Sequence, residues 1–410
     1  MHLRELAMSD QKSILCASKN TRRGVVLSVL LLGACGRSGL LPATASSAPR
    51  PEVECPGIDT QTDNNNCGGC GTVCSAIEPS TAICTLGRCL VMLSSGAPQE
   101  YRSFAVGAAD VFWTGIDDLS SSPDVPYGDF VKKIPIAGGV ASTIASTSGQ
   151  AQPGSIAVDA TTVYWTSSID WSAKAANGTI MKVPIGGGAS TTAASGQVTP
   201  TSVAVDAANI YWPNDDSVMK VPIAGGPLVA LASGQLSPSQ IVGNGATVYW
   251  VAFDTLVQRT AVWKVPLAGG LPTTVVSESN MGGLGGFAVH GSNVYYIDRA
   301  EGRYDILKIP VEGGAATALA SGKASNGGIA ADATHVYWTN TYWTNDDISE
   351  VNANSDVMRV PVAGGPATVL VSVHGSATSI VVDATSVYFR LNFQQTGQPR
   401  EASLMRLTPK

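Results

Sequence analysis

The sequence predicts an all-β fold: a seven-bladed β-propeller of four-stranded blades, preceded by a small disulfide-rich module. An aromatic dipeptide recurs seven times at an average spacing of 46 residues, which is in the range of four-stranded propeller blades. The 410 residues include 44 Gly and 23 Pro but only 14% charged residues, and Val, Ile, Thr and Tyr occur in short runs typical of strands. Six cysteines gather within 35 residues in front of the first copy of the repeat.

The N-terminal residues predict an export signal, which has to be set aside before the fold is considered. Basic residues between Lys12 and Arg23 precede an apolar run at Val25–Leu32 that ends in small residues. A run of this length is too short for a permanent transmembrane helix, which needs about 20 residues. Met8 is an alternative start, and Thr21-Arg22-Arg23 keeps a twin-arginine export signal open.

The end of the apolar run reads Leu32-Gly33-Ala34-Cys35 and resembles the lipobox of bacterial lipoprotein precursors. The resemblance implies that residues 1–34 are a signal peptide and that Cys35 becomes the lipidated N-terminus, with its acyl chains as the only membrane attachment. If the sorting rule of Gram-negative lipoproteins applies, Gly36 in place of Asp implies the outer membrane. An ordinary secretory signal with an incidental Cys is the alternative.

A tether and a disulfide-rich module follow the signal. Residues 35–54 are rich in Ser, Ala and Pro, and their lack of periodicity predicts a linker. An even number of cysteines in an exported chain predicts three disulfides, for which 15 connectivities are open. The six are Cys55, Cys67, Cys70, Cys74, Cys84 and Cys89. We expect the module at residues 55–89 and the propeller at residues 90–410.

The stretch NNNCGGCGTVC within this module resembles a short Cys-rich element found ahead of repeat domains in other exported bacterial proteins. Its Cys67-x-x-Cys70-x-x-x-Cys74 spacing leaves a zinc site as an alternative to disulfides, although no His lies nearby. Of the two other cysteines, Cys16 belongs to the signal and Cys35 carries the lipid, so no free thiol is expected for catalysis.

Each repeat unit predicts four short strands. In the second copy they read SIAVD, TVYWT, TIMKVPI and STTAAS, with an Asp-containing turn after the first strand and a Gly-rich hairpin after the third. The third strand carries a basic residue, an aliphatic residue and usually Pro. The aromatic pairs of the second strands are Phe112-Trp113, Tyr164-Trp165, Tyr211-Trp212, Tyr249-Trp250, Tyr295-Tyr296, Tyr337-Trp338 and Tyr388-Phe389.

The last copy has no fourth strand of its own. The segment LVMLSSG at Leu90–Gly96 precedes the first copy and is similar to LVALASG at Leu228–Gly234. We therefore expect an N-terminal strand to complete the last blade, because an open arc would leave two exposed sheet edges. Six or eight blades are the alternatives to seven.

The repeat region resembles the YWTD-type β-propellers of lipoprotein receptors and, more loosely, bacterial YVTN-type and TolB-like propellers. The resemblance rests on the VYWT-like second strand and covers residues 90–410. It is incomplete, because YWTD domains have six blades and an Asp after the Thr, whereas Asp298 is the one residue that keeps this acid here.

The repeated residues predict packing and turns. Alternation in VYWT places Val and Trp on one face of the sheet and Tyr on the other, so both faces are filled where blades stack. Four copies share an Asp that we interpret as turn-forming, because Gly107, Gly243 and His290 at the same position interrupt any ring of cation ligands. The four are Asp159, Asp206, Asp332 and Asp383. The lack of a GxSxG motif argues against a Ser-His-Asp hydrolase.

Candidate ligand residues lie in the connections between second and third strands, which vary in length and share one face of a propeller. The sixth, TNTYWTNDDISEVNANSD, repeats YWTN outside the register. Trp171, Tyr342 and Trp343 are candidates for stacking on a sugar or peptide, with Asp346, Asp347 and Asp356 as polar partners. The alternative is that these aromatics pack on the top of the propeller. The spacing Asn352-x-Asn354-x-Asp356 partly matches a calcium loop but lacks its Gly.

The sequence thus predicts a lipid-anchored protein of the cell envelope whose propeller is a binding or scaffold module for a protein, peptide or glycan. The alternative is a propeller enzyme of the lactonase or quinoprotein type, but no motif predicts a catalytic residue, a metal or a cofactor. A formal net charge of −6 without a Lys/Arg cluster argues against nucleic acid as a partner. We expect a monomer.

Overall fold

The computed structural model describes residues 59–96, 101–117, 128–148, 152–168, 176–254, 259–277, 284–300, 303–322, 327–343, 353–393 and 401–410. They belong to one unit of the chain, Val53–Lys410. None of these residues forms a helix long and apolar enough to cross a membrane. Cys35, Cys55, Trp171, Asp346 and Asp347 lie outside these ranges, so what the sequence predicts for them stays a prediction.

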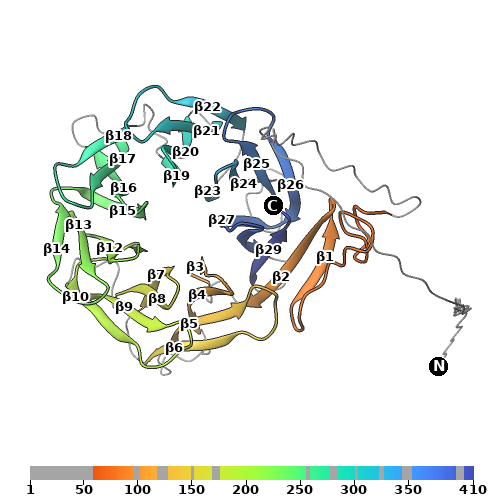
Figure 1. Ribbon diagram of the computed structural model, residues 1–410, viewed down its shortest axis with the longest axis horizontal. Helices are drawn as coiled ribbons and strands as arrows, with labels where there is room; N and C mark the ends of the chain where they lie inside the picture. The colour runs from red at the N-terminus through yellow and green to blue at the C-terminus, as the bar shows by residue number, and fades with distance from the viewer. Residues whose placement is uncertain are drawn as a thin grey trace, which may run out of the picture. The chain divides into compact units, whose positions relative to one another are not determined.

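Seven antiparallel sheets stand around a ring, with the first strand of each sheet innermost and the last strand outermost (Figure 1). Short turns join the first strand to the second and the third to the fourth; a Gly pair with positive φ, such as Gly187 and Gly188, forms the latter. This arrangement confirms the predicted all-β propeller with seven four-stranded blades.

The blades follow one another along the chain. Blade 1 has β3 (Ser103–Val106), β4 (Asp110–Asp117), β5 (Gly128–Pro135) and β6 (Ser142–Ser148); blade 2 has β7 (Gln152–Val158), β8 (Thr162–Ser168), β9 (Gly178–Pro184) and β10 (Thr191–Gln197). Blade 3 has β11 (Ala204–Val205), β12 (Asn209–Asn214), β13 (Ser217–Pro222) and β14 (Val229–Ala232); blade 4 has β15 (Leu236–Gly243), β16 (Thr247–Asp254), β17 (Arg259–Pro266) and β18 (Thr273–Ser277). Blade 5 has β19 (Leu284–His290), β20 (Asn293–Ala300), β21 (Arg303–Pro310) and β22 (Thr317–Gly322); blade 6 has β23 (Ile329–Ala331), β24 (His335–Trp343), β25 (Ala353–Pro361) and β26 (Thr368–His374).

The seventh blade joins the two ends of the propeller. It contains β27 (Ser376–Val382), β28 (Val387–Phe393), β29 (Glu401–Thr408) and, from the N-terminal side, β2 (Arg88–Gly96). β2 pairs antiparallel with β29, and Figure 1 shows the two strands side by side, one orange and one blue. Leu90 lies opposite Leu407 and Ser95 opposite Ser403, which confirms the predicted closure. β1 (Thr81–Thr85) adds a fifth strand at the outer edge of β2.

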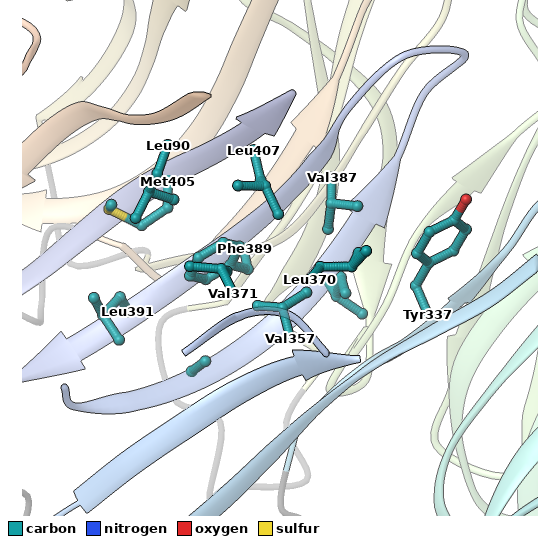
Figure 2. Close-up of a cluster of buried hydrophobic side chains, with 12 residues drawn as sticks. Leu90, Tyr337, Val357, Leu370, Val371, Val387, Phe389, Leu391, Met405 and Leu407 are labelled. Carbon is teal, nitrogen blue, oxygen red and sulfur yellow. The ribbon is translucent and has the colours of Figure 1, made fainter. Parts of the chain in front are cut away.

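The apolar core is divided into seven layers, one between each pair of neighbouring blades. The first aromatic of each dipeptide packs toward the next blade and the second toward the preceding blade, as alternation along a strand requires. In Figure 2, Tyr337 of blade 6 thus shares a layer with Phe389 and Leu407 of blade 7. The seven pairs that share a layer are Phe112/Trp165, Tyr164/Trp212, Tyr211/Trp250, Tyr249/Tyr296, Tyr295/Trp338, Tyr337/Phe389 and Tyr388/Trp113.

The repeated Asp caps the turn between the first two strands, as predicted. Asp159 accepts hydrogen bonds from the amides of Thr161 and Thr162, and its second oxygen accepts one of 2.7 Å from the Tyr164 hydroxyl. The same bond joins Asp206 to Tyr211, Asp332 to Tyr337 and Asp383 to Tyr388. In blade 4 the equivalent residue is Asn244, whose side chain caps the turn and donates to the Tyr249 hydroxyl at 3.3 Å. The prediction that Gly243 occupies the position of the repeated Asp is therefore wrong by one residue.

The basic residue of the third strand connects a blade to the next one in six of the seven blades; in blade 1, Lys133 instead meets Asp110 of its own blade at 3.2 Å. Lys182 of blade 2 donates a hydrogen bond of 2.9 Å to the carbonyl of Ile223 in blade 3, the residue that follows Pro222. Four more contacts repeat this rule: Lys220 to Leu267, Lys308 to Val362, Arg359 to Lys410 and Arg406 to Ile136. Lys264 instead meets the carboxylate of Glu312 at 2.6 Å. The basic-aliphatic-Pro signature is therefore a set of contacts between blades.

The cysteine module carries disulfides. Cys67 is bonded to Cys84 and Cys74 to Cys89, and Cys70 is also disulfide-bonded. These bonds rule out the zinc alternative for Cys67, Cys70 and Cys74, because their sulfurs are not free thiolates.

Candidate functional site

At the end where the second-to-third loops begin, the second strand of blade 6 runs one residue further past the aromatic pair than those of blades 1, 4, 5 and 7. The second YWTN motif does not start a loop: it prolongs β24, so that Tyr342 and Trp343 are strand residues. β25 is prolonged to match, and the pairing continues through Tyr342 opposite Asn354 and Trp343 opposite Ala353. The extra residues therefore extend the two sheet faces of blade 6 beyond the packed core.

The two predicted aromatics leave this extension on opposite faces. Tyr342 lies on the same face as Asn340 and Trp338, and Trp338 packs in the layer that blade 6 shares with blade 5. Trp343 lies on the other face, in line with buried Thr339 and Thr341. The structure brings Tyr342 and Asp356 to one surface, and it does not bring Trp343 there.

Three strands build rows of polar side chains on the face that blade 6 turns toward blade 5. Tyr342, Asn354 and His374 form the outermost row, and the ring Nδ1 of His374 lies 3.4 Å from the Asn354 side-chain oxygen. The next row inward consists of Asn340, Asp356 and Ser372. Its Ser372 hydroxyl donates a 2.6 Å hydrogen bond to Oδ1 of Asp356. Both rows stand on strand positions, so the backbone fixes their spacing.

The electrostatics couple the two rows. Burial and, after it, the negative charge of Asp356 raise the pKa of Tyr342 above its ordinary value. Tyr342 is 37% exposed. At neutral pH the outermost row therefore presents the neutral phenol of Tyr342, which can donate a hydrogen bond. The next row presents the carboxylate of Asp356, which can accept one.

A small pocket of about 80 Å³ lies between blades 5 and 6, and Asn340 of the second polar row lines it. Trp338, Asn340 and Met358 line it from blade 6, and blade 5 contributes the side opposite them. The lining from blade 5 is Tyr304, Ile306, Ala320, Ser321 and Gly322, and Ala367 completes it. We call this pocket together with the two polar rows the blade 5/6 groove. Its floor is apolar and its mouth is polar.

Trp338, at the floor of the groove, is buried but slightly less completely than the equivalent Trp residues of blades 2, 3 and 4. Trp338 is 7% exposed, whereas Trp165, Trp212 and Trp250 are fully buried. In blades 3 and 4 a Gln fifteen residues earlier accepts a hydrogen bond from the indole, as Gln197 does from Trp212 at 2.9 Å and Gln235 from Trp250 at 3.2 Å. The residue fifteen before Trp338 is Lys323, so the sequence of blade 6 changes at this place too.

The blade 5 wall of the groove carries a cation. The guanidinium of Arg299 lies over the ring of Tyr304, 5.9 Å from its centre. Asp298 and Asp305 of the same blade point to the opposite face, toward blade 4, because they alternate with Ile297 and Ile306 of the layer shared with blade 6. Among the described residues, the groove thus has the Asp356 carboxylate on one wall and the Arg299 guanidinium on the other.

Sequence reasoning identified Tyr342 and Asp356 but not their neighbours. Asn340, Ser372, His374 and Trp338 come from the repeat itself, where they look like ordinary strand residues. The sequence did contain a signal for Asn340. If the strand continues past Trp338, every second residue lies on the same face, which places Asn340 and Tyr342 on the face of Trp338. In the described part of the chain, no group of three or more His, Cys, Asp or Glu is arranged to hold a metal ion. Of the partial calcium-loop spacing, Asn352 lies outside the described residues.

No protein-family model matches this chain, and no curated protein matches its sequence. Similar solved structures include a chain of the nidogen/laminin complex, with 16% identity and a TM-score of 0.44 over 61% of this chain and 93% of that chain. A putative TolB from Agrobacterium tumefaciens has 13% identity and a TM-score of 0.41 over 66% and 95%. A prolyl endopeptidase has 14% identity and a TM-score of 0.49, over 78% of this chain and 54% of that one. At these identities the likeness concerns the propeller fold alone.

Proposed function

We propose that this protein is a lipid-anchored component of the cell envelope whose propeller binds a protein, peptide or glycan on the face where the second-to-third loops begin. The observation that carries the proposal is the blade 5/6 groove. It combines an apolar floor that includes Tyr304 and Met358 with the polar side chains of Asn340 and Ser321 in the same lining, a combination that is usual in ligand sites. No catalytic step is part of the proposal.

The ring supports such a role because it holds the groove rigidly. The groove side chains lie on β24, β25 and β26, whose backbones are paired along their length. A site built on paired strands loses little conformational freedom when a ligand binds, so less of the binding free energy is spent on ordering. The Cys35 lipid and the residues 35–54 tether would keep this site at the membrane surface.

Titration of the full-length protein with envelope polysaccharide, peptidoglycan fragments and a peptide pool tests the binding role. The variant Tyr342→Ala, Asp356→Asn changes the groove. Leu271→Ala is its control, because Leu271 is 87% exposed in the turn between β17 and β18, at the other end of the strands. We expect the groove variant to lose binding and the control to keep it. Equal binding by both would remove the groove from the proposal.

The lipid anchor is tested separately by growth with labelled palmitate. We expect label in the protein and none in Cys35→Ser. An unlabelled wild-type protein would exclude the anchor and leave the binding role untouched.

A further inference from the structure

We infer that the ligand of the blade 5/6 groove is a neutral saccharide, held by one or two sugar units. This inference rests on the proposed function, since it names the ligand class of the same site. It follows from three properties of the groove: the hydrogen-bonding groups in its rows, the balance of charge between its walls, and the position of its aromatic floor relative to the sheet edges.

The polar rows offer the mixture of donors and acceptors that sugar hydroxyls require. Each hydroxyl of a sugar is both a donor and an acceptor, and neighbouring hydroxyls need two partners side by side. Asn340 and Asp356 are directly opposed on β24 and β25, so their planar side chains start about 5 Å apart. The amide of Asn340 donates and accepts, and Asp356 accepts. Tyr342 and Asn354 repeat this combination one row further out.

Ser372 makes this arrangement more definite. Its hydroxyl occupies Oδ1 of Asp356 at 2.6 Å, which fixes the carboxylate plane and directs the second oxygen for a ligand. A charge-assisted hydrogen bond from a sugar hydroxyl to such an oxygen is stronger than a neutral one. Ser372 is accordingly a positioning residue for Asp356.

The charges favour a ligand without net charge. Asp356 on the blade 6 wall would repel a uronic or sialic acid, and Arg299 on the blade 5 wall would repel a lysine or arginine side chain. His374, which stands in the same row as Tyr342, is a further titratable residue among the described residues of the blade 6 wall. Its ring contacts the side chain of Asn354. A neutral polyhydroxyl ligand can donate to the carboxylate and accept from the guanidinium, and removing its hydroxyls from water costs less than burying an ionic group.

The floor and the edges distinguish a sugar from a peptide. Met358 and Tyr304, both partly exposed, provide a small apolar surface against which the C–H face of a sugar ring can pack. A peptide bound by strand addition would instead pair with an open sheet edge, which the outermost strands β22 and β26 provide. The polar rows instead lie on the face of the sheet from β24 to β26. On this face side chains project, not free backbone groups.

Calorimetric titration of the full-length protein tests this inference. The probes are neutral oligosaccharides of glucose, galactose, mannose and N-acetylglucosamine, oligogalacturonate as the acidic saccharide, and lysine-rich and neutral peptides. We expect at least one neutral oligosaccharide to bind, and Asn340→Ala and Asp356→Asn each to weaken it by about ten-fold or more, the usual effect of losing a hydrogen bond to a charged or well-placed group. Ser372→Ala should weaken it less.

The matched control is Asp305→Asn. Asp305 occupies in blade 5 the position that Asp356 occupies in blade 6, and its side chain faces blade 4. We therefore expect Asp305→Asn to bind the neutral oligosaccharide within about two-fold of wild type. Melting temperatures of all variants show that each one is folded.

Two outcomes overturn the inference and are distinguishable. If a peptide or the acidic saccharide binds, and Asn340→Ala and Asp356→Asn weaken that binding, the ligand class is wrong and the binding groove stands. If some probes bind but none responds to the groove variants, or if no probe and no envelope fraction binds, the groove itself is not the site and the proposed function fails with it.

Discussion

Arg406 in the last blade donates a hydrogen bond to the main-chain carbonyl of Ile136 in the first blade. The contact completes a series in which a basic residue of one blade reaches the residue after the proline of the next. Arg406 supplies this contact at the point where the chain termini meet, whereas Lys133 of blade 1 pairs with Asp110 of its own blade. Ring closure therefore depends on this side chain as well as on the pairing of β2 with β29.

Replacing Arg406 by Met is expected to lower the free energy of unfolding by about 1–3 kcal/mol, because the partly buried carbonyl of Ile136 loses a charged donor. Thermal unfolding followed by circular dichroism measures this as a drop of several degrees. Lys182→Met removes the equivalent contact inside the ring and should cost a similar amount. A neutral effect of Arg406→Met would show that the contact does not contribute to closure.

The strand pairing at closure gives a second prediction. Leu90 and Leu407 lie opposite each other across β2 and β29, and both are buried. Each Leu→Ala substitution is expected to destabilise the protein by about 2–5 kcal/mol. Because the side chains share one core layer, their effects should be non-additive in a double-mutant cycle by about 0.5 kcal/mol or more. Strict additivity in urea unfolding would mean that the two residues do not stabilise each other.

The capped turns predict a plateau of stability against pH. Burial alone would raise the pKa values of Asp159, Asp206 and Asp383, but the turn amides and the Tyr hydroxyls outweigh it and lower them. A carboxyl with a lowered folded pKa stabilises the fold above its unfolded pKa, about 4, and this contribution is lost as pH falls through the folded value. The hydroxyl partners have raised pKa values, mainly through burial. Their contribution to the stability of the fold is lost only as pH rises past about 10, the ordinary pKa of tyrosine.

Urea unfolding between pH 2 and 11 should therefore show constant stability from about pH 7 to 9 and a decrease on either side, because burial lowers the pKa of His335 and its protonation in the unfolded chain reduces stability below about pH 6.5. Asp332→Asn should flatten the acid limb, because hydrogen bonds from Lys410 and from the turn amides overcome the burial effect and hold the pKa of Asp332 well below its ordinary range. If wild type and Asp332→Asn lose stability in parallel below pH 4, this carboxylate is not among the groups responsible.

The residues of this propeller divide clearly into those that sequence could and could not assign. Closure was predictable because Leu90–Gly96 repeats the pattern of an existing fourth strand. The contact from Lys182 to Ile223 was not, since it depends on how far one blade is shifted along the next. The error at Gly243 has a local cause: the turn after β15 contains Gly-Asn-Gly, and the bonds of the Asn244 side chain to the turn amides and to Tyr249 fix its register.

The groove was half predictable for a similar reason. The duplicated YWTN drew attention to Tyr342 and Trp343, but period-two alternation in a continuing strand sends adjacent side chains to opposite faces. Whether the duplication continues the strand or starts a loop is decided by Ala353 and Asn354, which pair with it from ten residues further along.

The last prediction tests the geometry of the groove without a ligand. Asp356 and burial together raise the pKa of Tyr342, so Asp356→Asn should lower that pKa by removing the negative charge while burial stays the same. Ser372→Ala keeps the charge and should leave Tyr342 closer to its wild-type titration. The measurement is the pH dependence of the Tyr342 ring signal in NMR spectra of labelled protein, assigned with Tyr342→Phe. Because Asp305 faces blade 4, Asp305→Asn should not move the curve. An unchanged Tyr342 titration in Asp356→Asn would mean that the phenol and the carboxylate do not share a surface, and the groove as described would not exist in solution.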